Sequence, residues 1–318
     1  MLRWGILITS LVMAAVVVVG CGGGGGGGTP GTANVLSFNG AAAVGDLLTY
    51  TLNPTTLEYA YSILEPASAR TTGAGVLTPV AGFGQYVYTT SDNDTVVLFP
   101  NNLCLVAPRD GDGLIAGVPT LSTNYSTAGL AGDYNYVNAH VYGTNCDSDH
   151  GTFRVNAGGT WSAWSQSNFV GVADETGTWV DQGNGIIYIY QNFGAGDVKV
   201  GHLMVLPGTT GGKLLVVDHY CTEAGHEKYG ITLGIKQRTL AVGDLQGTLT
   251  VLDSDENAPY TVEISGTQVT SPGGTATWNL NSPWIGFAQD PVSLALPTVD
   301  GVIFGGNATS IFAGVKQQ

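Results

Sequence analysis

The feature that most restricts the fold of this chain is a repeated alternation of apolar and polar residues, interrupted by Gly, Asn, Asp or Pro. Such alternation places apolar side chains on one face of a β-strand, and the interrupting residues form turns. Sequential hairpins favour an antiparallel meander, because parallel strands need crossovers of a dozen or more residues. We therefore predict an all-β protein of antiparallel meanders, with hairpins at 47–64, 151–165, 177–190 and 198–220.

A faint internal repeat divides the chain into three β-rich units. AVGDL occurs at 43–47 and 241–245, and LAGDY at 130–134 takes the corresponding place between them. The units end in similar segments: GLIAGVP (113–119), YGITLGIK (229–236) and SIFAGVK (310–316). Related sheets of this kind close into barrels or stack on one another. Chance recurrence in a Gly-rich chain is the alternative. The predicted β units are 33–122, 128–238 and 240–318.

Composition restricts the partners of the protein. The 318 residues include 10 Lys and Arg but 24 Asp and Glu, for a formal net charge of −14. Nucleic acid and anionic membrane surfaces would repel such a chain, so we expect no nucleic-acid partner. Charged residues make up only 11% of the sequence, against about 25% in typical domains. A low charge content with many Gly, Thr, Ser and Asn residues is typical of an exported β-protein with many turns.

The first twenty residues have the layout of a secretory signal peptide. Arg3 precedes an uncharged run from Trp4 to Val19, which is shorter than the roughly 20 apolar residues that a membrane-spanning helix needs. The sequence Val18-Val19-Gly20-Cys21 resembles the lipobox of bacterial lipoproteins. This resemblance implies cleavage of the signal (1–20) before Cys21 and acylation of the cysteine by chains such as palmitate. The alternative is an uncleaved anchor helix.

The residues after the cysteine extend this expectation. Seven glycines follow Cys21, and a Gly-rich segment behaves as a flexible coil, so residues 21–32 are predicted to be a lipidated tether. Several acyl chains on one cysteine would give durable anchoring. Gly22 directly after the cysteine resembles lipoproteins that are passed to the outer membrane. We expect an outer-membrane lipoprotein, either periplasmic or exposed at the cell surface.

The middle unit is similar in style to the small barrels of lipocalin-like proteins. It opens with Gly132-Asp133-Tyr134 and carries Gly-Thr-Trp at 159–161 and 177–179. Lipocalins have a Gly-x-Trp on their first strand, whereas here the Gly-Thr-Trp triplets come later, so the resemblance implies architecture alone. A barrel of about eight strands encloses one small ligand or is filled by its own side chains.

Three cysteines remain after Cys21. Cys104 lies in an apolar strand and is predicted to be a buried thiol. Cys146 and Cys221 lie at strand ends of the middle unit, and we predict a disulfide between them, because exported thiols usually oxidise. Such a bridge would bring the histidines of that unit to one rim as a candidate ligand or metal site: His150, His219 and His226. The alternatives are a zinc site of Cys146, Cys221, His150 and His226, or neither.

Period-two alternation makes a further prediction for this region: it places His219 and Cys221 on one face of their strand and Asp218 on the other.

Five tryptophans follow the signal peptide, and they are candidates for stacking on sugars or holding an apolar ligand. Trp161 and Trp164, three residues apart, should face opposite sides of a strand, with one in the core and one exposed.

The sequence contains no Gly-x-Ser-x-Gly, His-Glu-x-x-His or phosphate-binding Gly-Lys-Ser/Thr motif. We name no catalytic residues, metal or cofactor. The hypothesis is a lipid-anchored envelope protein that binds or scaffolds, with a small apolar molecule, a glycan or another envelope protein as its partner. The alternative is a hydrolase acting on envelope or extracellular polymers.

Overall fold

The computed structural model describes most of the chain from residue 35 onward. The described residues are 35–65, 72–83, 86–98, 103–108, 113–120, 127–142, 145–194, 196–207, 213–224, 228–253, 258–298, 301–307 and 310–317. Residues 34–318 form one compact unit. The predicted signal and tether lie outside the described residues, and within the described ones no helix is long and apolar enough to cross a membrane.

The first β unit is an antiparallel meander of nine strands among the residues described. Their order in the sheet is β4-β3-β2-β1-β9-β8-β7-β6-β5. In the β2–β3 hairpin, Asn53 Oδ1 accepts the backbone N–H of Thr55 at 2.9 Å and of Thr56 at 3.2 Å. This side-chain turn explains why the chain reverses at Asn53-Pro54. The strands are β1 (Leu36–Ala42), β2 (Leu47–Leu52), β3 (Glu58–Glu65), β4 (Thr72–Val76), β5 (Thr78–Pro79), β6 (Val87–Thr89), β7 (Thr95–Leu98), β8 (Cys104–Ala107) and β9 (Ile115–Pro119).

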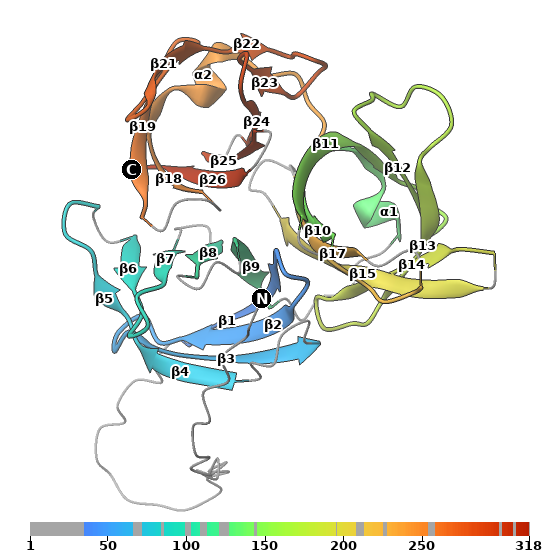
Figure 1. Ribbon diagram of the computed structural model, residues 1–318, viewed down its shortest axis with the longest axis horizontal. Helices are drawn as coiled ribbons and strands as arrows, with labels where there is room; N and C mark the ends of the chain where they lie inside the picture. The colour runs from blue at the N-terminus through green and yellow to red at the C-terminus, as the bar shows by residue number, and fades with distance from the viewer. Residues whose placement is uncertain are drawn as a thin grey trace, which may run out of the picture. The chain divides into compact units, whose positions relative to one another are not determined.

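The second β unit, called the middle barrel here, is a closed barrel of eight antiparallel strands in sequence order, in which β10 pairs with β17. A four-residue helix, α1 (Thr127–Leu130), precedes it, and Figure 1 shows this helix within the ring of strands. The strands are β10 (Gly132–Tyr142), β11 (Asn145–Val155), β12 (Thr160–Ser165), β13 (Glu175–Asp181), β14 (Ile187–Asn192), β15 (Asp197–Pro207), β16 (Lys213–Cys221) and β17 (Lys228–Lys236).

The third β unit repeats the topology of the first within the described residues. Its strand order is β21-β20-β19-β18-β26-β25-β24-β23-β22, so both units are meanders whose first and last strands pair. A short helix, α2 (Val242–Leu245), precedes it. The strands are β18 (Gly247–Asp253), β19 (Tyr260–Ser265), β20 (Gln268–Ser271), β21 (Gly274–Thr277), β22 (Asn279–Leu280), β23 (Ala288–Gln289), β24 (Leu294–Pro297), β25 (Val302–Gly306) and β26 (Ile311–Lys316).

These three units confirm the prediction of an antiparallel all-β fold. The repeated closing segments are the last strands β9, β17 and β26, and each pairs with the first strand of its own unit. The two AVGDL pentapeptides do not occupy equivalent positions in their units. Residues 43–46 form the turn between β1 and β2 and Leu47 begins β2, whereas residues 241–245 contain α2, which comes before the first strand of its unit.

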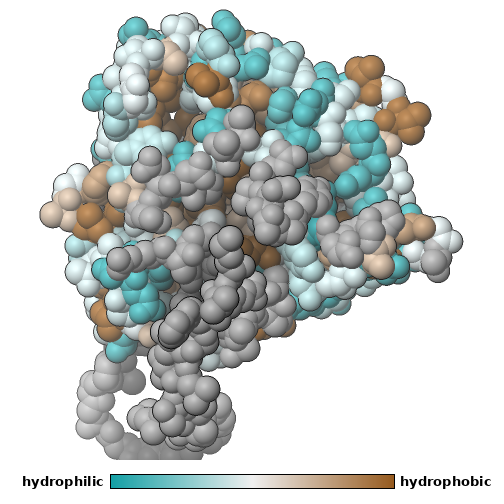
Figure 2. All heavy atoms as spheres, in the orientation of Figure 1, coloured by the Kyte–Doolittle hydropathy of each residue, from teal (hydrophilic) through white to brown (hydrophobic). Residues whose placement is uncertain are grey.

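One hydrophobic cluster contains side chains from all three units. Leu105 of the first unit, Met204 of the middle barrel and Phe304 of the third are almost fully buried members. The first and third units therefore bury apolar residues against the outer wall of the barrel, while a separate cluster fills one end of its interior. In Figure 2, the described part of the visible face is largely hydrophilic or intermediate, with apolar side chains in small separate patches.

Candidate functional site

The interior of the middle barrel holds a cavity of about 920 Å³. Side chains that line it come from all eight strands, because every second residue of a barrel strand points inward. One end is apolar and closed, the centre carries polar side chains, and the other end is charged.

The closed end of the cavity is built by α1 and by aromatic residues of the strands. The Tyr134 hydroxyl donates to the Leu130 carbonyl at 2.8 Å, which ties the end of α1 to β10. Leu130 packs in one buried cluster with Trp161 and Leu215. The cavity wall above this cluster includes Phe153 and Ile189 and is therefore apolar.

Trp161 is fixed in this wall by a glycine on the neighbouring strand. Its indole N–H lies 3.2 Å from both the Thr178 and the Tyr190 carbonyl oxygens, on β13 and β14. The indole can reach them because Trp161 is paired with Gly177, which has no side chain in the way. Gly177, the first residue of the Gly-Thr-Trp triplet at 177–179, thus leaves the space that Trp161 of the triplet at 159–161 occupies.

Two histidines form the polar centre. The rings of His140 and His219 are perpendicular with centroids 4.8 Å apart, and His219 Nε2 lies 2.8 Å from Thr232 Oγ1. Burial, with a smaller contribution from the positive charge of Lys228, lowers the pKa of both imidazoles well below 6.5. Both rings are therefore neutral near pH 7 and offer hydrogen bonds without charge.

The open end carries charged groups. Three carboxylates lie along one side of the cavity. Asp149 belongs to β11, Glu175 begins β13, and Asp174 directly precedes that strand. The Lys228 ammonium donates to Glu175 Oε1 at 3.2 Å. The strands β13 and β17 are four positions apart in an eight-stranded ring, so this ion pair spans the mouth of the barrel.

The predicted Cys146–Cys221 disulfide is not formed in this structure. Cys221 is a free, buried thiol that lines the cavity; the side chain of Cys146 lies outside the described residues. Backbone pairing explains why: Cys146 is opposite Val141, Val141 opposite Tyr229, and Tyr229 opposite Tyr220. The two cysteines are three strands apart, roughly 14 Å along the curved barrel wall at the usual strand spacing. Even the shorter straight line between strands so far apart exceeds the roughly 4.4–6.8 Å between the Cα atoms of bridged cysteines.

The three histidines of the predicted rim do not meet at one place. His219 lines the cavity, but His150 points away from it and stacks on Trp284 of the third unit, with centroids 5.7 Å apart. His226 lies outside the described residues. Among the residues described, no group of three or more His, Cys, Asp or Glu is placed to hold a metal ion. Cys104 is a buried free thiol, as its sequence context predicts.

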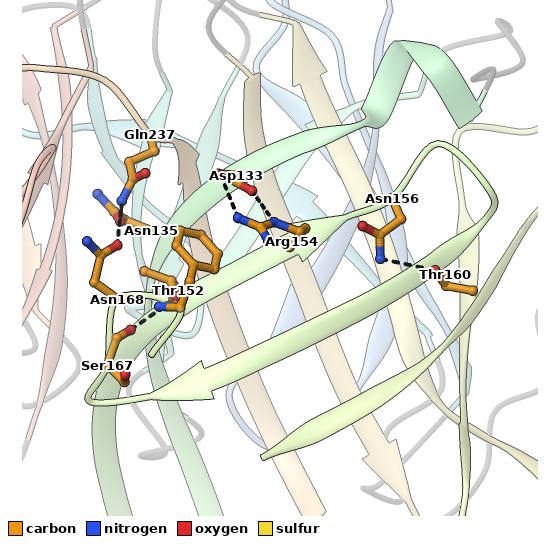
Figure 3. A network of polar contacts seen from close by, with 10 residues as sticks. Asp133, Asn135, Thr152, Arg154, Asn156, Thr160, Ser167, Asn168 and Gln237 are labelled. Atoms are coloured by element: carbon orange, nitrogen blue, oxygen red, sulfur yellow. Dashed lines mark hydrogen bonds and ion pairs between the residues drawn. The ribbon is translucent and has the colours of Figure 1, made fainter. Parts of the chain in front are cut away.

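Trp161 and Trp164 do face opposite sides of β12, but the prediction that one of them is exposed is wrong. Trp164 is only 9% exposed. The segment after β12 folds back over it, with Phe169 at 5.2 Å between ring centroids. Figure 3 shows this segment held by polar contacts: Thr152 Oγ1 donates to the Ser167 carbonyl at 2.8 Å and accepts the Phe169 N–H at 3.2 Å.

The outer wall of the barrel contains a buried polar chain that the sequence reasoning missed. His202 Nδ1 lies 2.7 Å from Asp218 Oδ2, and both residues are fully buried. His202 Nε2 is 3.4 Å from Glu65 Oε1 of the first unit, and Lys199 Nζ pairs with the same carboxylate. Burial raises the pKa of Asp218, and the bond from His202 partly offsets this effect. The sequence signal for this chain was the period-two alternation, which places Asp218 on the face of β16 opposite to that of His219.

Comparison with known proteins does not assign the site. No family model matches the chain, and no curated protein matches it. The crystal structure of the glycoside hydrolase, family 43 YxiA protein from Bacillus licheniformis is similar over 86% of this chain and 81% of that one, at 10% identity and a TM-score of 0.22. A TM-score this low carries no argument about function.

Proposed function

We propose that this protein is a lipid-anchored envelope protein that binds a small apolar or amphipathic molecule inside the middle barrel. The observation that carries the proposal is the 920 Å³ cavity with an apolar closed end. Its size falls within the roughly 300–1,000 Å³ of small-molecule sites. Eight-stranded barrels are wide enough to hold one such ligand.

The lining supports a binding role in two ways. Aromatic and aliphatic side chains at the closed end remove apolar ligand surface from water, at about 25 cal/mol for each Å² buried. The neutral imidazoles of His140 and His219 and the hydroxyl of Thr232 are polar groups at the centre of the same cavity. An apolar wall with a few fixed polar groups is the usual composition of a ligand site.

Calorimetric titration with n-decanol tests the proposal. Decanol should bind, and Ala163→Trp should weaken binding at least tenfold, because Ala163 lines the cavity and an indole there fills it. Ser162→Trp is the matched control: it introduces the same side chain one residue earlier, on the outer face of β12, and should leave the affinity unchanged. Absence of decanol binding to the wild-type protein, or equal affinities of the two folded variants, would refute the proposal. If the protein were instead a hydrolase, incubation with a polymeric substrate would yield shorter products.

The anchor is the second part of the proposal, and it is supported by the lipobox-like sequence before Cys21. Mass spectrometry of the mature protein should find an acylated N-terminus at Cys21. Cys21→Ala should release the protein from membranes while decanol binding by the barrel persists. An intact Met1 terminus would contradict the anchor without affecting the cavity.

A further inference from the structure

We infer that the middle barrel selects ligands with a positively charged head, of the alkylammonium class, over neutral and anionic molecules with the same tail. This inference rests on the proposed function, because it concerns the ligand of the same cavity. It depends on three observations: the polarity along the cavity, the balance of charge at its mouth, and the position of one lysine side chain.

The cavity is graded from end to end. Phe153, Trp161 and Leu215 lie toward the end closed by α1, and the carboxylates Asp149 and Glu175 lie at the opposite end. A ligand that fills this space must be amphipathic, with its apolar part inward and its polar part at the mouth. The gradient fixes the orientation of the ligand before any charge is considered.

The charge at the mouth is negative. Among the described lining residues, three carboxylates face one ammonium: Asp149, Asp174 and Glu175 against Lys228, an excess of two negative charges. Burial is the main reason why the pKa of Tyr136, inside the cavity, is raised, and all three carboxylates raise it further, so their field extends into the interior. The described polar side chains at the centre add no counter-charge, because desolvation keeps the His140 and His219 imidazoles neutral near pH 7.

Lys228 shows how the mouth receives an alkylammonium group. Its ammonium, carried on a four-carbon stem, donates to Glu175 Oε1 at 3.2 Å from the opposite side of the barrel. The side chains of Lys228 and Glu175 are 18% and 35% exposed, so the pair is partly solvated. Ion pairs of this kind contribute little to stability, and an incoming amine can replace the lysine at low cost or bind beside Asp149 and Asp174.

Among the described residues that line the cavity, only Lys228 could pair with an anionic head, and its ammonium already binds Glu175. A carboxylate ligand would have to break this pair and then lie next to Asp149 and Asp174. A neutral hydroxyl head can donate a hydrogen bond to a carboxylate, but it gains no charge–charge attraction. The expected order of affinity is therefore n-decylamine, then n-decanol, then n-decanoate.

The test is calorimetric titration with these three ligands at pH 7 and low ionic strength, where the amine and the carboxylate are both charged. Decylamine should bind about three- to tenfold more tightly than decanol, and this preference should shrink as salt is added. If decanol binds but decanoate binds as tightly as decylamine, the inference is overturned and the proposed function stands. If none of the three binds, the proposed function fails.

Two variants of opposite sign separate selectivity from a loss of structure. Glu175→Gln should lower the ratio of decylamine to decanoate affinity about three- to tenfold, and Lys228→Gln should raise it by a similar factor, because it removes the competing ammonium. Glu263→Gln, an identical charge change on the exposed face of β19, is the control and should leave the ratio unchanged. If both cavity variants shift the ratio in the same direction, or neither shifts it, the inference is overturned.

Discussion

Replacement of Gly177 by alanine should destabilise the protein far more than a strand glycine normally would. A Cβ at this position would overlap the Tyr190 carbonyl oxygen and would lie 2.7 Å from Trp161 Nε1. Strand β14 therefore has to move outward, or the indole has to leave its site. Overpacking of this kind costs about 1–3 kcal/mol.

The lost hydrogen bonds add to that cost. The Trp161 indole N–H is shared between the Thr178 and Tyr190 carbonyl oxygens at 3.2 Å each, and loss of this interaction costs about 1 kcal/mol. Replacing glycine reduces the entropy of the unfolded chain, and this stabilisation offsets about 0.4–1 kcal/mol of the loss. We expect a net loss of about 1–3 kcal/mol in the free energy of unfolding, together with weaker decanol binding, because Trp161 lines the cavity.

Urea denaturation followed by tryptophan fluorescence measures this loss. Gly158→Ala is the matched control, because a Cβ there meets no heavy atom within 4 Å. It should leave the stability unchanged or raise it by up to about 1 kcal/mol. If Gly177→Ala proves no less stable than Gly158→Ala, then Gly177 does not provide the space for the Trp161 indole and our account of this wall is wrong.

Three further predictions concern buried groups. His202→Ala should cost about 3–5 kcal/mol, because it leaves the fully buried Asp218 carboxylate without its imidazole partner; in urea titrations, a loss below 1 kcal/mol would contradict this. Burial raises the pKa of Cys104 to about 12, so iodoacetamide at pH 8 should label it only after unfolding, and rapid labelling of the folded protein would show an accessible thiol. The pKa values of His140 and His219 lie below 6.5 in the folded barrel. As the pH falls from about 6.5 to 5, the unfolded chain therefore binds more protons than the folded one, and the free energy of unfolding should decrease. The double variant His140→Gln/His219→Gln should show a weaker dependence of stability on pH. An unchanged slope would refute the assignment of this dependence to the two histidines.

Local pattern predicted the antiparallel all-β class and the four hairpins, and a faint repeat indicated three β-rich units. The closing segments GLIAGVP, YGITLGIK and SIFAGVK share a glycine followed by a β-branched residue, and in each unit this glycine lies opposite a residue of the first strand. Asn53-Pro54 could be identified as a turn because its side-chain hydrogen bonds reach only two or three residues along the chain. The opposite faces of Asp218 and His219 follow from period two alone.

Predictions that required distances between strands failed or were missed. The Cys146–Cys221 pairing assumed that two strand ends in one unit are close, but β10 and β17 lie between them. One of Trp161 and Trp164 was expected to be exposed, but a strand pattern cannot show that residues after the strand fold back over Trp164. The Lys228–Glu175 pair joins residues 53 positions apart, and neither residue stands in a recognisable motif.

The sequence by itself determined the antiparallel all-β class and the hairpins, because these depend on side-chain alternation and turn residues within a few positions. The division into three units was only indicated, by a faint repeat. Only the tertiary structure decided that the middle unit closes into a ring, that the ring leaves a cavity, and which charges meet at its mouth. Closure brings β10 against β17 and places β13 opposite β17, and such distances depend on the number and stagger of all eight strands together rather than on any one segment.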